Sequence, residues 1–154
     1  MKYLIVYTSE TGTTKKCATM LKEKLRNITS VDLNDKMPSL ENYDLVIIGT
    51  PIRMGQINKK IKKFLKDNEK ILLTKKTAYF ICCAFEKDKE AYFTANFNPN
   101  LLKHALIYDC FGGELDLNNL HGFSKLIAKL ATKNNKKPIK LNTENITKFI
   151  EKIT

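Results

Sequence analysis

A polar stretch near the start of the chain, Y-T-S-E-T-G-T-T-K-K at 7–16, is rich in hydroxyl side chains. It follows the apolar run K-Y-L-I-V-Y and leads into an amphipathic pattern. A loop that enters a helix in this way presents unpaired backbone N–H groups and the positive end of the helix dipole. Hydroxyls can add donors, and Gly12 lets the backbone approach an oxygen closely. The stretch therefore predicts an anion site; the alternative is a Ser/Thr-rich turn that only caps a helix. The candidate ligands are Ser9, Glu10, Thr11, Gly12, Thr13 and Thr14.

The type of anion site is restricted by motifs that the sequence lacks. Neither G-x-G-x-x-G nor G-x-x-x-x-G-K-[ST] occurs, so the loop indicates neither a dinucleotide site of that type nor an NTPase. What remains is a phosphate held by hydroxyls and backbone amides, without lysine or metal. The carboxylate of Glu10 can point away from such an anion.

The elements that must position this loop alternate between buried strands and amphipathic helices. Strand patterns occur at 2–7, 44–49, 77–83 and 104–110, with a shorter one at 30–33. Apolar residues at helical spacing follow three of them, including Ile57, Ile61, Phe64 and Leu65; a polar helix is expected at 87–97, stopped near Pro99. The final helix, 142–153, has Asn142 or Thr143 as a candidate cap. This order requires crossovers, and therefore predicts one α/β domain over 1–154 with a parallel sheet and helices on both faces.

Ligands bind to open parallel sheets beyond the carboxyl ends of the strands, where the strand order reverses. Three segments leave those ends: 8–14, 50–56 and 84–87. We therefore expect them to form one site. The segment 112–140 exceeds a minimal fold of this type and adds about one basic, amphipathic helix before the last one. Its apolar side contains Leu120, Phe123, Ile127 and Leu130, and its charged side contains Lys125, Lys129, Lys133, Lys136 and Lys137.

Composition favours a cytoplasmic protein. The chain has no apolar run near the roughly 18 residues that a membrane helix needs, and its start does not resemble a signal peptide. Cys17, Cys82, Cys83 and Cys110 show neither metal-ligand nor C-x-x-C spacing, so we expect buried, reduced thiols. The net charge of +11 suits an anionic partner, but a lysine-rich, arginine-poor composition of this kind also arises in an AT-rich genome. No aromatic–basic surface pattern indicates nucleic-acid binding.

The segment S-E-T-G-T-T, between the first strand and the first helix, resembles the phosphate loop of flavodoxins, which cradles the phosphate of FMN. The resemblance covers the whole chain. It implies a flavodoxin-like doubly wound sheet of five parallel strands in the order 2-1-3-4-5, with FMN at the switch point.

The second segment is similar to a narrower group. The sequence G-T-P-I-R-M-G after E-N-Y-D-L-V-I-I resembles the I-R-x-G loop of the flavodoxin-domain, quinone-dependent protoporphyrinogen oxidases, which also carry an insertion where 112–140 lies. This resemblance implies an FMN-dependent oxidoreductase that passes electrons from flavin N5 to a quinone or another acceptor. The alternatives are an electron-transfer flavodoxin, which is a carrier and not an enzyme, and a binding module that has lost FMN.

The resemblance also assigns roles to residues of the second and third loops. Ile52 and Met54 would cover one face of the isoalloxazine and Phe85 the other, although packing at the loop base explains Phe85 equally well. Arg53 is the candidate group near flavin N1 and O2, where its charge would stabilise the negative charge gained on reduction; the alternative is a solvated base. The remaining candidate contacts are Thr50, Pro51, Gly55 and Ala84.

Partners follow from the same resemblance. A redox partner protein or a quinone would exchange electrons with the flavin, and an anionic porphyrinogen is a candidate substrate. The lysines of 112–140 could attract its propionates or an anionic membrane surface at the inner face of the cell membrane, unless they form an ordinary solvated helix face. His104 is expected at a strand entry, and His121 at the start of the extra helix as a capping or exposed residue.

Overall fold

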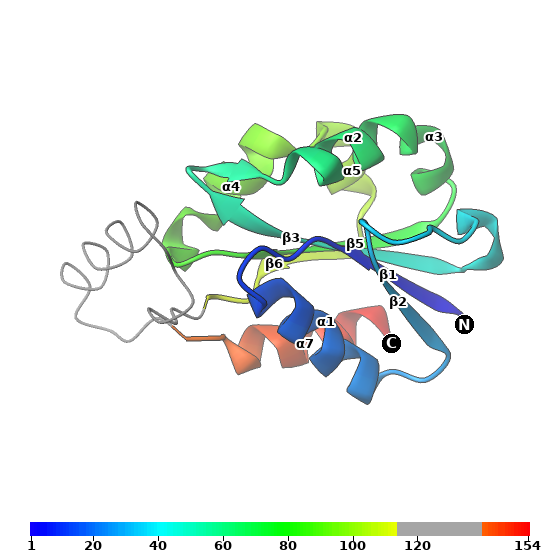
Figure 1. The fold of residues 1–154 in the computed structure, drawn as a ribbon, viewed down its shortest axis with the longest axis horizontal. Helices are drawn as coiled ribbons and strands as arrows, with labels where there is room; N and C mark the ends of the chain where they lie inside the picture. Colours follow the sequence, from blue (N-terminus) through cyan, green and yellow to red (C-terminus); the bar gives the residue numbers. More distant parts are fainter. Residues whose placement is uncertain (114–139) are drawn as a thin grey trace.

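The computed structural model describes residues 1–113 and 140–154 as a central sheet between two layers of helices (Figure 1). The strands are β1 (Tyr3–Tyr7), β2 (Ile28–Asp32), β3 (Leu45–Arg53), β4 (Gln56–Ile57), β5 (Lys76–Cys82) and β6 (Ile107–Cys110). The helices are α1 (Thr13–Lys24), α2 (Lys59–Asp67), α3 (Glu69–Leu72), α4 (Lys89–Asn96), α5 (Pro99–His104) and α7 (Thr143–Ile153). Two short 3₁₀ helices, η1 (Leu40–Asn42) and η2 (Glu86–Asp88), lie between them.

The main strands are parallel and run in the order β2-β1-β3-β5-β6. This is the predicted order 2-1-3-4-5, with β5 and β6 as the fourth and fifth parallel strands. The two-residue strand β4 lies off this path and pairs antiparallel with the end of β3. The strand order reverses at β1, which has β2 on one side and β3 on the other.

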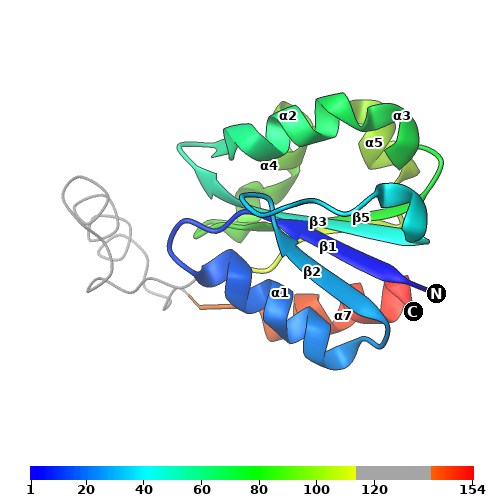
Figure 2. The same ribbon diagram turned by 45° about the vertical axis from the view of Figure 1, so that its right-hand side comes forward.

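The two faces of the sheet bury separate apolar clusters. Helices α1 and α7 cover one face, and α2, α3, α4 and α5 cover the other (Figures 1 and 2). Along β1 the side chains alternate as a pleated strand requires: Ile5 packs toward α1 and α7, whereas Leu4 and Val6 pack on the opposite side. The strands are buried on both faces, which explains their nearly continuous apolar sequence.

Two predictions about the second loop were wrong. The segment 50–53 was expected in a loop, but β3 continues through it to Arg53 and then turns back into β4. Ile57 was expected on the next helix, but it lies in β4 opposite Ile52. The helix begins only at Lys59, after Asn58 accepts a hydrogen bond from Lys60 N. Local hairpin pairing therefore overrides the helical spacing at Ile57.

The prediction for His104 was also wrong. A strand was expected to begin there, but His104 is the last residue of α5, and β6 begins at Ile107. The dipeptide Asn98-Pro99 starts this helix, because Asn98 caps it and proline fits the first helical position. The ring of His104 lies 2.7 Å from the carbonyl oxygen of Lys75, as expected for a structural histidine.

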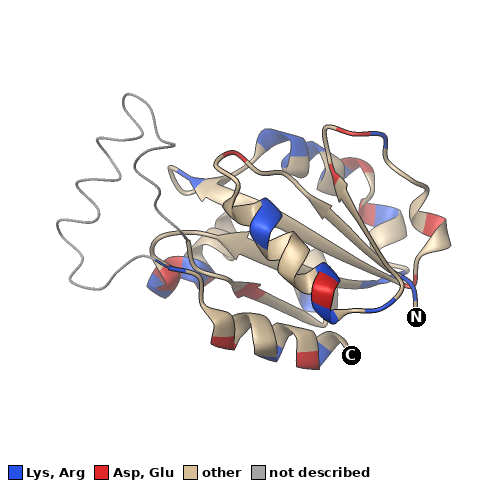
Figure 3. Cartoon of the chain, turned by 60° about the horizontal axis from the view of Figure 1, so that its bottom comes forward, with Lys and Arg blue, Asp and Glu red and all other residues tan. Residues whose placement is uncertain are grey.

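Most of the basic segment 112–140, including His121 and the five lysines assigned to it, lies outside the described residues. The structure does show how the chain leaves and re-enters: Gly112 forms an antiparallel bridge with Leu141. Over the described ranges, no helix is both long and apolar enough to cross a membrane. Both acidic and basic residues occur along α7, whereas the charged residues of α1 are lysines except for Glu23 (Figure 3).

Candidate functional site

The sheet brings the three predicted loops to one edge. Tyr7, at the end of β1, is in register with Gly49 of β3, and Pro51 of β3 is in register with Cys82 of β5. The chain therefore leaves three adjacent strands on the same side, next to the point where the strand order reverses. A backbone hydrogen bond from Thr8 N to the carbonyl of Gly49 (3.3 Å) joins the first loop to β3.

The first loop is shaped around the N-terminus of α1. Gly12 caps the helix with a φ of 96°, a conformation that favours glycine, and a side chain there would meet nothing within 4 Å. Ser9 Oγ accepts hydrogen bonds from Gly12 N (3.1 Å) and Lys15 N (3.3 Å). The intrahelical ladder starts with Lys16 N, so the amides of Thr13 and Thr14 precede it and face the loop. Ser9 thus accepts from Gly12 N and Lys15 N, and the amides of Thr13 and Thr14 are the ones that the loop offers to a ligand.

Thr14 contributes a buried hydroxyl at the same helix end. The residue is 1% exposed, and its Oγ1 has no hydrogen-bond partner of ordinary geometry. The thiol of Cys82 lies near enough for Thr14 to act on the pKa of Cys82, but this is a weak interaction for a hydroxyl. Thr8 Oγ1, 3% exposed, is likewise buried without a partner. Leaving a buried hydroxyl unpaired costs about 1–3 kcal/mol, which an anion at the loop could remove.

The second loop is a tight hairpin and not an open loop. Ile52 pairs with Ile57 and Arg53 with Gln56, which leaves Met54 and Gly55 as the two-residue turn. Both have positive φ values, 52° and 73°, as a type I′ turn requires. A non-glycine residue in this conformation costs about 1–2 kcal/mol. The turn holds the Met54 side chain 82% exposed at the rim of the site.

Glu10 connects the first two loops. Its carboxylate forms an ion pair with Arg53 (2.9 Å) and accepts a hydrogen bond from Asn58 Nδ2 (3.4 Å). The pair is partly exposed, with the Arg53 side chain 53% and the Glu10 side chain 30% accessible. Glu10 therefore turns toward the hairpin, and the charge of Arg53 has a partner within the protein. The role of Arg53 beside a flavin stays a prediction.

Asn96 is a site-supporting residue that sequence reasoning missed. It lies at the end of α4, and its amide donates to the carbonyl of Gly55 (2.9 Å) and accepts from Ile57 N (3.2 Å). It therefore fixes the hairpin at the turn and on the returning strand β4. Nothing local in the sequence indicates this contact, because 41 residues separate Asn96 from Gly55.

The third loop follows β5. Ala84 is half-buried, and Phe85 is 36% exposed, among the few large apolar side chains left accessible. Glu86 comes next, with its Oε2 accepting from Asn142 Nδ2 (3.3 Å) while its Oε1 is buried without a partner. Ala84 and Phe85 thus lie at the predicted edge, and their contact with a flavin stays a prediction.

The four cysteines are buried, as expected, and they form two close pairs that were not foreseen. Cys82 and Cys17 approach to 3.7 Å between sulfurs on the face covered by α1, whereas Cys83 and Cys110 approach to 2.8 Å on the other face. Adjacent residues of a strand point to opposite faces, so Cys82 and Cys83 separate as predicted. The hydrogen bond with Cys110, followed by burial, raises the pKa of Cys83 far above its usual value, whereas the bond from Cys83 and one from Gly112 N lower the pKa of Cys110.

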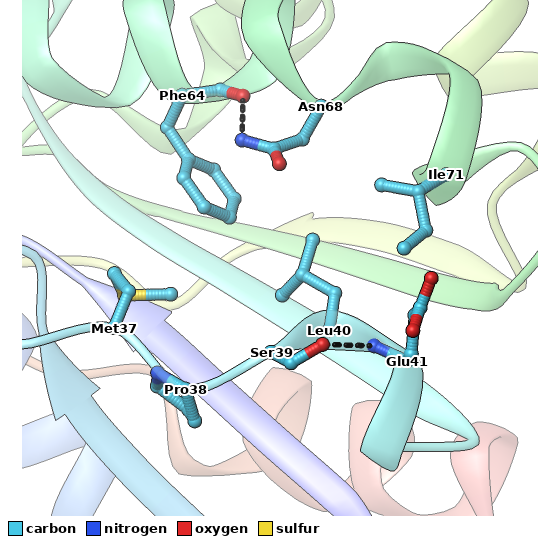
Figure 4. Close-up of a pocket in the computed structure, with 8 residues that line it drawn as sticks. All are labelled: Met37, Pro38, Ser39, Leu40, Glu41, Phe64, Asn68 and Ile71. Atoms are coloured by element: carbon cyan, nitrogen blue, oxygen red, sulfur yellow. Dashed lines mark hydrogen bonds between the residues drawn. The ribbon is translucent and has the colours of Figure 1, made fainter.

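A separate cavity of about 430 Å³ lies between the segment after β2 and helices α2 and α3 (Figure 4). None of its lining residues belongs to the three loops. They are Met37, Pro38, Ser39, Leu40, Glu41, Phe64, Asn68 and Ile71.

Comparison with known protein families identifies the family of this chain. A family model described as a flavodoxin domain matches residues 4–142, most of the chain, and the chain therefore belongs to that family. No curated protein sequence matches it.

Solved structures share the fold. The flavoprotein from Lactobacillus acidophilus in complex with FMN is similar with a TM-score of 0.58 and 20% identity, covering 71% of this chain and 92% of that one. Oxidised flavodoxin 1 from Bacillus cereus is similar with a TM-score of 0.54 and 20% identity, covering 98% of this chain and 93% of that one. At this identity the likeness shows the fold alone.

Proposed function

We propose that this member of the flavodoxin domain family binds FMN at the edge formed by the three loops and acts in electron transfer. The observation that carries the proposal is the geometry of the first loop. Gly12 has a left-handed conformation there, and the first amides of α1 and the buried hydroxyl of Thr14 lie at the same helix N-terminus. The amides and the hydroxyl fit a phosphate because each can donate to it, and Gly12 lets the backbone approach it closely. FMN would supply the redox chemistry when bound.

The other two loops fit the ring system of a flavin. Met54 and Phe85 are large apolar side chains that stay exposed at this edge, whereas the apolar side chains of the neighbouring strands are buried. Covering them with an aromatic ring would remove apolar surface from water and exclude water from the ring. The hairpin carrying Met54 is held in place by Asn96 and by the Glu10–Arg53 pair, so the cover is largely formed before binding.

The direct test is titration of the purified chain with FMN, with flavin fluorescence as the readout. We expect a yellow protein or saturable quenching with one FMN per chain. A colourless chain that takes up no added FMN would overturn the proposal. Riboflavin, which lacks the phosphate, is the matched control ligand. It should bind much more weakly, and equal binding would remove the first loop from the argument.

A second candidate, which the hairpin favours, is an FMN-dependent oxidoreductase of the quinone-dependent protoporphyrinogen oxidase type. Support comes from the I-R-M-G sequence at the turn and from the positive net charge of +11, which suits a substrate with carboxylates. Turnover of protoporphyrinogen with menadione as acceptor tests this candidate. Turnover would favour the enzyme over the carrier, and its absence in an FMN-loaded chain with reversible redox chemistry would leave the carrier.

A further inference from the structure

The closest pair of thiols in the described residues lies beside the third loop. Cys83 directly follows β5, and Cys110 ends the neighbouring strand β6. Their sulfurs are 2.8 Å apart, and the residues are 5% and 0% exposed. A disulfide bond has a sulfur–sulfur length of about 2.04 Å, so only a small closure separates the two thiols from a bond.

The backbone holds this geometry. Cys83 N donates to the carbonyl of Gly112 (2.9 Å), and Phe111 N donates to the carbonyl of Ile81 (2.9 Å), so the ladder between β5 and β6 continues past both cysteines. Asn145 of α7 also donates to the carbonyl of Cys110 (2.9 Å). Cys110 is opposite Ile81 in the register, and Cys83 lies two residues farther along on the same face, so the two side chains meet diagonally where the two strands end.

We propose that Cys83 and Cys110 form an oxidisable dithiol that a peroxide converts into an intramolecular disulfide across β5 and β6. The thiolate sulfur of Cys110 attacks one peroxide oxygen; the O–O bond breaks, hydroxide leaves, and a sulfenic acid forms. The sulfur of Cys83 then attacks the sulfur of Cys110, loses its proton, and displaces the second oxygen as water. Overall, two thiols and hydrogen peroxide give one disulfide and two waters, and the two electrons pass to the peroxide.

The surroundings assign different roles to the two sulfurs. Cys110 accepts a hydrogen bond from Gly112 N (3.3 Å), and this bond together with the one from Cys83 lowers its pKa. A backbone N–H donor favours negative charge on the sulfur that accepts from it, and a thiolate is the reactive form of cysteine, so we assign the first reaction to Cys110. Cys83 lies 2.8 Å from the sulfur of Cys110 and is therefore placed to resolve the sulfenic acid; the hydrogen bond with Cys110 and burial raise the pKa of Cys83.

The second pair provides an internal comparison. Cys17 and Cys82 are equally buried, but their sulfurs are 3.7 Å apart, and the pair joins a helix to a strand. The greater separation makes bond formation harder, because the helix and the strand would have to move together. Oxidation should therefore select one pair of the two.

The test uses the full chain treated with hydrogen peroxide, then denatured, alkylated and digested for mass spectrometry. We expect the alkylatable thiols to fall from the four in the sequence to two, with a linked peptide that contains Cys83 and Cys110. Variant C82S, which removes a member of the other pair, should keep this link, and C110S should lose it. In denaturant the preference for this pair should disappear. Four free thiols after treatment, a Cys17–Cys82 link, or a sulfinic acid on Cys110 without a link would each overturn the proposal.

The link would bear on the flavin loop, since Ala84 and Phe85 follow Cys83 directly. A covalent tie to β6 would restrict the base of this loop, so FMN should leave the oxidised chain several-fold more slowly than the reduced chain. This consequence rests on the proposed FMN site, whereas the thiol count does not. Equal release rates from a chain shown to be linked would overturn the coupling to the loop.

Discussion

Replacing Thr14 with valine should make the chain more stable without ligand and weaken its binding of FMN. The hydroxyl of Thr14 is buried at 1% exposure and has no ordinary hydrogen-bond partner. An unsatisfied buried hydroxyl costs about 1–3 kcal/mol, and the nearby Cys82 thiol places Thr14 at the low end of that range. We therefore expect T14V to raise the unfolding free energy of the ligand-free chain by about 1 kcal/mol, or its midpoint by roughly 2–4 °C.

The same hydroxyl should be worth more when FMN is present. A hydrogen bond to a charged group contributes about 1.5–3 kcal/mol, so its loss should weaken FMN binding by roughly ten- to hundred-fold. Thermal unfolding of the ligand-free protein and flavin fluorescence titration measure the two effects separately.

Thr77 offers a matched control. Its hydroxyl is also buried, at 0% exposure, without a hydrogen-bond partner of ordinary geometry, and it lies near enough to Tyr79 to act on the pKa of that residue, as Thr14 does on Cys82. Thr77 lies near the start of β5 at the opposite edge of the sheet. T77V should give a comparable gain in stability and leave FMN affinity unchanged. If T14V instead lowered stability and left FMN affinity intact, the Thr14 hydroxyl would be serving an internal bond, and the reasoning about the phosphate loop would be refuted.

Three further predictions concern the hairpin and the core. R53Q should lower the flavin reduction potential and E10Q should raise it, and the double variant should lie near the original value because the two charges offset each other. Potentiometric titration measures these potentials. A double variant with the potential of R53Q alone would contradict the pairing. M54N should stabilise the ligand-free chain by about 1 kcal/mol, since asparagine suits the positive φ of a type I′ turn. It should also weaken FMN binding, because the exposed apolar side chain is lost. A destabilised M54N would argue against the turn. Burial raises the pKa of Tyr79 to about 12 from its ordinary value of 10.0, so above pH 10 the unfolded chain loses this proton first and the unfolding free energy falls until about pH 12. Y79F should lack this part of the fall when stability is measured by denaturant titration at each pH. Identical pH profiles for the two proteins would contradict the prediction.

The sequence alone determined the main architecture and the first loop. Continuous apolar strands such as β1 and β3 are buried on both faces, and their alternation with amphipathic helices leaves few topologies other than a parallel sheet with crossovers. The position of loop 9–14 between β1 and α1 could also be read directly, because a helix N-terminus, a glycine and adjacent hydroxyls occur within a few consecutive residues; that the loop holds an anion stays a prediction. Local chemistry of this kind needs no knowledge of distant contacts.

Two other features were predicted wrongly, for different reasons. Ile57 matched a helical spacing, yet pairing with Ile52 made it a strand residue. The helix α5 before β6 was missed although its start signal is local: Asn98 caps it and Pro99 fits its first position, whereas the prediction followed the apolar pattern alone.

Only the tertiary structure decided which side chains meet. Glu10 contacts Asn58 across 48 positions, Asn96 holds Gly55 across 41, and Cys83 meets Cys110 across 27. Each of these contacts depends on the register between strands or on the crossover that returns a helix to the sheet edge, and side-chain spacing along the chain does not encode either. The sequence thus placed loop 9–14 at the edge of a parallel sheet, whereas the tertiary structure brought Arg53 to Glu10 and two buried thiols to within 2.8 Å of each other.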